Sequence, residues 1–103
     1  MEDKALDLLI EYYLNLNPVG EKEYWNEDIF EQKVYTAWGV MEIYNEIKNN
    51  PDTLPIEVVE NFASKMNEYS CKDNKTSHIF SIAYDVSLDI LDQLISMKEE
   101  ENL

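Results

Sequence analysis

The chain has 103 residues, 45% of them hydrophobic, with only two glycines and three prolines. This length fits a single domain spanning residues 1–103, and the apolar content predicts a folded core, which argues against a disordered chain. Asp and Glu number 22 against 8 basic residues, which gives a formal net charge of −14. A chain so negative repels phosphate backbones. We therefore expect no direct binding to nucleic acid, and attraction toward basic proteins instead.

Two further features bear on where the protein acts. The first residues, Met1 to Lys4, lack the basic and apolar regions of a secretory signal, and no apolar run is long enough to span a bilayer. Cys71 is the only cysteine, so no disulfide can form within the chain. Together these features predict a cytoplasmic protein without a membrane partner.

The first half of the chain predicts two helices. Apolar residues recur at spacings of three and four over residues 2–16. The segment Asn17-Pro18-Val19-Gly20 ends this helix, because proline lacks an amide hydrogen and glycine tolerates the turn. Asn26 is a good N-cap for a second helix over residues 26–49, which Asn50-Pro51 ends.

The second half predicts two more helices. Pro55 suits the first position of a helix over residues 55–70, and a hydroxyl of Thr76 or Ser77 can cap a fourth over 76–98. Glu99 to Glu101 then oppose the helix dipole, so we expect fraying there. Short connections and no strand signal predict an all-α fold, an antiparallel up-down four-helix bundle.

A helical wheel divides the second helix into an apolar half, expected to face the core, and an acidic half that also holds two aromatic rings. Residues three and four apart are neighbours on a helix, so the acidic half forms a continuous strip. The apolar half consists of Phe30, Val34, Ala37, Val40, Met41, Tyr44 and Ile47, and the strip consists of Glu27, Glu31, Tyr35, Trp38, Glu42 and Glu46.

Aromatic rings among carboxylates are typical of interface hot spots, where the rings supply contact area and the acids attract a basic partner. Under this interpretation Trp38→Ala and Glu42→Lys weaken binding and leave helicity intact. The alternative is that Tyr35 and Trp38 pack beneath the first helix, or beneath residues 21–25, a segment that is either a loop or an early turn.

The fourth helix also has a polar face with several acids. Asp85, Asp89 and Asp92 fall on it, and no lysine occurs between Ile79 and Met97. These carboxylates therefore have no cation within their own helix. Two interpretations remain open: the face is simply solvated, or a partner supplies the cations.

Histidine and cysteine, the usual nucleophiles, bases and zinc ligands, are few, and the motifs of common metal and phosphate sites are missing. His78 is the only histidine and has no spacing signature with Cys71. Structural zinc needs four such ligands, and neither a Glu-x-x-His motif, an EF-hand loop nor a Gly-rich phosphate loop occurs. We expect no enzyme, no cofactor and no metal site.

One set of carboxylates suggests an alternative. Glu57 with Glu60 and Asp89 with Asp92 form pairs three residues apart on two predicted helices. This arrangement resembles the all-helical nucleotide pyrophosphohydrolases of the MazG type, whose acidic pairs hold magnesium. The resemblance covers only these four positions, lacks the family's leading motif of three acids, and places both pairs on polar faces. It implies a magnesium-dependent nucleotide hydrolase.

Charge and helix faces favour a different function, a small acidic inhibitor or immunity protein that neutralises a basic partner stoichiometrically. A nuclease toxin or another nucleic-acid-handling protein would be its target. In size, charge and class the chain resembles the acidic helical proteins that neutralise colicin-type nucleases, although no family motif is matched. Tyr24 and Trp25 would extend the contact, and DNA mimicry is a variant of this hypothesis. A structural or regulatory accessory protein of a phage or mobile element, monomeric or homodimeric, is the remaining alternative.

Overall fold

The computed structural model describes residues 2–15, 27–72 and 77–101. They form four helices and, within these ranges, no strand: α1 (Glu2–Leu14), α2 (Glu27–Asn49), α3 (Pro55–Lys72) and α4 (Ser77–Glu101). The all-α class is confirmed, and each predicted helix is present.

The last helix ends about one turn later than predicted. The sequence predicted an end at about Lys98, whereas α4 continues through Glu101, and the expected fraying of this end stays a prediction. Lys98 lies in the last turn, where its positive charge offsets the negative end of the helix dipole.

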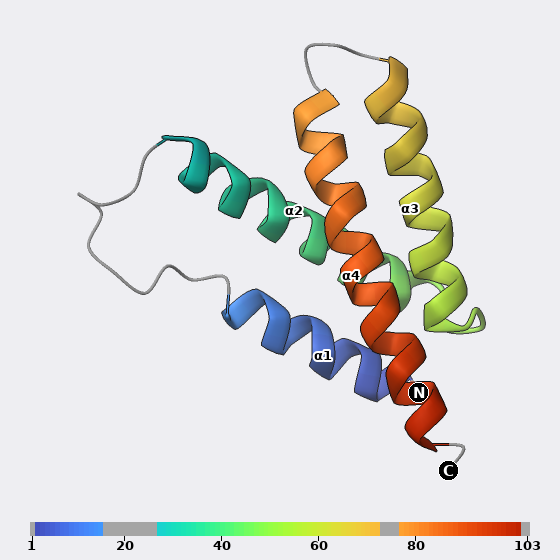
Figure 1. The fold of residues 1–103 in the computed structure, drawn as a ribbon. Coiled ribbons are helices and arrows are strands. Elements are labelled where there is room, and N and C mark those ends of the chain that lie inside the picture. The colour runs from blue at the N-terminus through green and yellow to red at the C-terminus, as the bar shows by residue number, and fades with distance from the viewer. Residues whose placement is uncertain (1, 16–26, 73–76, 102–103) are drawn as a thin grey trace.

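The helices pack as a bundle (Figure 1). α3 and α4 lie side by side and run in opposite directions. α1 and α2 also run in opposite directions and contact each other, but they diverge toward the end of α1 and the start of α2. α4 contacts both α3 and α2, and α2 also contacts α1 and α3. α2 is therefore the helix that joins the first pair to the second. The regular up-down order of the bundle stays a prediction.

Small residues set the contact between α2 and α4. A Cβ atom added to Gly39 would lie 3.4 Å from the Cα and Cβ atoms of Ala83. Ser87, one turn further along α4, is fully buried, and its hydroxyl donates a 2.7 Å hydrogen bond to the carbonyl of Tyr84. This bond satisfies the buried hydroxyl. Side chains this small allow two helix axes to approach at the short end of the usual range.

The core draws apolar side chains from all four helices, which is why α1 remains attached although it is the shortest. Burial of such side chains is the main favourable contribution to folding. The buried cluster consists of Ala5, Leu9, Val40, Ile43, Ile47, Val58, Val59, Phe62, Met66, Ala83, Val86, Ile90 and Leu94.

The buried face of α2 differs from the predicted one. Val34 is 47% exposed and Met41 53% exposed, so their predicted inward position is wrong, whereas Ile43 is fully buried. The reason is the contact at Gly39, which turns this side of α2 toward α4. Glycine has no apolar side chain and so does not register in a hydrophobic pattern. For this reason the helical wheel placed the buried face of α2 on the Met41 side, whereas the structure buries the Gly39 and Ile43 side.

Substitutions at Gly39 test this contact. Gly39→Ala adds a methyl group that just fits against Ala83, so we expect a free energy of unfolding equal to wild type or up to about 1 kcal/mol higher, from the better helix propensity of alanine. Gly39→Leu forces the two helices apart and lowers that free energy by roughly 1–3 kcal/mol. Urea unfolding followed by circular dichroism measures both. Equal stability of the two variants would contradict the close approach.

Candidate partner-binding surface

Trp38, the central ring of the predicted strip, is half-buried and packs against a neighbouring helix. Its ring meets Phe80 of α4 edge-on, with centroids 6.3 Å apart. Phe80 in turn lies 5.3 Å from the ring of Tyr69 on α3. Edge-to-face pairs at such distances stabilise a fold beyond the area they bury. Trp38 thus packs on α4, where Phe80 links it to Tyr69 of α3, and only part of its ring remains available to a partner.

The rest of the α2 strip is also partly enclosed. Tyr35, Glu42 and Glu46 are half-buried. Glu46 takes part in ending the helix, because its backbone carbonyl accepts a 2.7 Å hydrogen bond from the side-chain amide of Asn50. The side chains of Glu27 and Glu31 lie outside the part of the chain that the structure describes. Among the described members, none is fully exposed.

The three acids predicted on the fourth helix are, in contrast, all exposed. Asp85, Asp89 and Asp92 are spaced by four and three residues, so they form one row along α4, here called the acidic stripe. No lysine occurs in α4 before Lys98. The stripe is therefore a line of negative charge with no cation supplied by its own helix.

Asp89 also holds α1 against α4. The hydroxyl of Tyr12 donates a 2.8 Å hydrogen bond to the Oδ2 atom of Asp89, across 77 positions of sequence. Burial, reinforced by the hydrogen bond and the negative charge of Asp89, raises the pKa of Tyr12 to about 12. The phenol is thus a hydrogen-bond donor at neutral pH, and Asp89 has a structural role besides its charge.

Two adjoining hollows lie between α1 and α4 beside the stripe, with volumes of about 420 and 280 Å³. They share Leu8 and Gln93, so we treat them as one feature, the acidic groove. Its lining includes the apolar side chains of Leu8 and Met97 and the exposed carboxylates of Glu11 and Asp92. The first hollow is lined by Leu8, Glu11, Tyr12, Asn15 and Gln93, and the second by Leu8, Asp92, Gln93, Ser96 and Met97.

The contribution of α1 to this surface was not predicted from the sequence. Leu8, Glu11 and Tyr12 follow the spacing of three and four that predicts one side of a helix. That spacing shows that they share a side of α1. It carries no information about which helix lies opposite, so only the tertiary structure places them beside Asp92.

The two acidic pairs considered as magnesium ligands do not form a common cluster in the described part of the chain. Glu57 and Glu60 are exposed on α3, whereas Asp89 bonds to Tyr12 of α1. Over the side chains that the structure describes, no three His, Cys, Asp or Glu residues come together to hold a metal ion.

Cys71 is a free, exposed thiol, and the side chain of His78 lies outside the described set. None of the helices described is both long and apolar enough to cross a membrane.

Comparison with known proteins gives no relative, since no family model, no curated protein and no solved structure matches the chain. A proposal for its function therefore depends on the chain's own side chains.

The packing of Trp38 changes the outcome expected for its removal. Trp38→Ala leaves a void beside Phe80, so we expect the free energy of unfolding to fall by about 2–4 kcal/mol, contrary to the intact fold expected from the sequence. Glu42→Lys, four residues on, is the control and should change it by no more than about 0.5 kcal/mol. Chemical denaturation of both variants decides the matter, and an unchanged stability for Trp38→Ala would show that its ring contributes little to the fold.

The hydrogen bond of Tyr12 predicts a pH effect. The pKa of Tyr12 in the folded state lies above the ordinary value of 10. The contribution of this phenol to the stability of the fold is therefore complete below pH 10 and is lost as pH rises toward 12. Tyr12→Phe should lower the free energy of unfolding by about 0.5–1 kcal/mol at neutral pH. It should also reduce the fall in melting temperature between pH 10 and 12. Identical alkaline profiles for variant and wild type would contradict this role.

Proposed function

We propose that the protein binds a basic partner protein stoichiometrically through the acidic stripe and the acidic groove, and acts as a small inhibitor without catalysing a reaction. The observation that carries the proposal is the exposed row Asp85, Asp89 and Asp92, on a helix with no lysine before its last turn.

The electrostatics of the stripe support a cationic partner. Carboxylates three and four residues apart repel each other and destabilise a helix by a few tenths of a kcal/mol per pair. Lysine or arginine side chains from a partner would remove this repulsion. They would also be drawn in by the net charge of −14, since complementary charge raises the rate and specificity of association.

The acidic groove suits the side chains that such a partner would offer. Lysine and arginine combine an apolar stem with a charged head. In the groove, Leu8 and Met97 would contact the stem, and Glu11 or Asp92 would receive the charge. Proteins that bind nucleic acid present such side chains to phosphates. A nuclease or another nucleic-acid-handling protein is therefore the class of target that we propose.

Neutralising the stripe tests the proposal against a matched control. The tagged protein would be incubated at low salt with extract of its source cell, and the partner released by rising salt. We expect one basic protein to be retained at a one-to-one ratio. Asp85→Asn with Asp92→Asn should weaken its binding about tenfold, since each exposed ion pair contributes up to about 1 kcal/mol. Asp89 is kept, because it holds Tyr12.

The control is Glu57→Gln with Glu60→Gln, which removes the same charge from an exposed face of α3. It should retain the partner at nearly wild-type affinity. Equal weakening in both double variants would show that only the total charge matters and that the stripe is not the binding site. Failure to retain any basic protein at a one-to-one ratio would refute the proposed function.

A further inference from the structure

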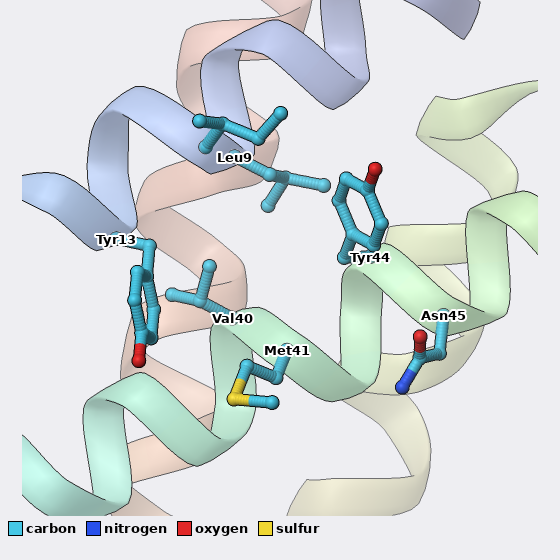
Figure 2. A pocket seen from close by; sticks show the side chains of 7 residues that line it. Leu9, Tyr13, Val40, Met41, Tyr44 and Asn45 are labelled. Atoms are coloured by element: carbon cyan, nitrogen blue, oxygen red, sulfur yellow. The ribbon is translucent and has the colours of Figure 1, made fainter.

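A second groove, between α1 and α2, differs in chemistry from the acidic one. It has a volume of about 380 Å³, and its lining contains no charged side chain. Figure 2 shows the rings of Tyr13 and Tyr44 on either side, with Val40 and Met41 of α2 between them. We call this feature the apolar groove; it is lined by Leu9, Ile10, Tyr13, Val40, Met41, Tyr44 and Asn45.

The apolar surface extends beyond the groove itself. Ile10 is 46% exposed and Met41 53% exposed, and both line it. Leu14 lies four residues after Ile10 and Val34 seven residues before Met41, so each continues the same row of its helix, and both are exposed. Exposed apolar side chains on both helices beside a groove are typical of an interaction site.

Charge on the two sides of the groove indicates what would fill it. Asp7 is exposed on α1, one turn before Ile10, and Glu42 follows Met41 on α2. Lys48 lies beside Tyr44, with its Nζ atom 5.4 Å from the ring centroid. The groove thus has a carboxylate beside it on each helix and one lysine at the Tyr44 end, an arrangement complementary to a segment with an apolar ridge and basic flanks away from that end.

We propose that the apolar groove binds an amphipathic helix of the basic partner, which inserts apolar residues spaced i, i+3 or i+4 and i+7 between α1 and α2 and points lysines or arginines toward Asp7 and Glu42. This inference rests on the proposed function and adds the form of the partner's segment. Helix-in-groove recognition uses this pattern of anchors. A second copy of the chain fits less well, since two molecules of charge −14 repel each other.

A designed peptide tests the groove without knowledge of the partner. The probe is a helical peptide of leucine and lysine with one apolar face, and its twin has glutamate in place of every lysine. Calorimetry at physiological salt should show one leucine–lysine peptide bound per chain, and binding of the glutamate twin at least about tenfold weaker.

The groove variant is Met41→Gln, which keeps the length of the side chain and makes its end polar. We expect it to weaken binding of the leucine–lysine peptide about five- to tenfold, the cost of one lost apolar anchor. Leu54→Gln is the matched control, because Leu54 is 56% exposed, close to the 53% of Met41, and lies outside the groove. It should bind the peptide as wild type does. Equal affinity of the two variants would overturn the inference.

Two further results separate this inference from the proposed function. If Met41→Gln retains the source-cell partner fully while Asp85→Asn with Asp92→Asn loses it, the proposed function stands and the apolar groove is not part of the interface. If sizing chromatography shows a wild-type dimer that Met41→Gln dissociates, a second copy fills the groove and the inference is wrong.

Discussion

The close approach of Gly39 to Ala83 determines how the two pairs of helices meet. Since α2 carries most of the contact between them, its rotation about its own axis decides which side chains are enclosed. Ile43 is turned into the core, Trp38 packs on Phe80, and Met41 is left outside. A larger residue at either contact position would separate the axes and change all three placements together. The surfaces that we propose for binding therefore depend on a contact that belongs to neither of them.

The position of α1 creates both grooves. Its buried face, with Ala5 and Leu9, joins the common core, and Tyr12 links it to α4 through Asp89. One side of α1 then borders α4 and forms the acidic groove, and the other borders α2 and forms the apolar groove. Asp7 and Glu11 are exposed on the same helix. A single partner that covered α1 could reach both grooves at once, so we regard them as two parts of one surface.

The two parts would contribute differently to binding. Exposed carboxylates attract a basic protein from a distance and select against acidic ones, but each exposed ion pair adds little affinity. Apolar side chains act only at contact, and burying them supplies most of the affinity in known interfaces. The acidic stripe would thus govern the rate and specificity of encounter, and the apolar groove the lifetime of the complex. Under the proposed function, tight binding would need both parts.

The sequence by itself determined the four helices and much of the charge pattern, because both depend on neighbours in the chain. Pro55 begins α3, Asn50-Pro51 ends α2, and the spacing of Asp85, Asp89 and Asp92 places them in one row. Only the tertiary structure decided which sides of those helices meet. The signal that turns α2 is a glycine, which has no hydrophobic side chain to count, and the partner of Asp89 lies 77 positions away. Met41 was misplaced for this reason, and the choice between an exposed and a packed Trp38 stayed open, because periodicity describes a helix alone whereas burial depends on the helix packed against it.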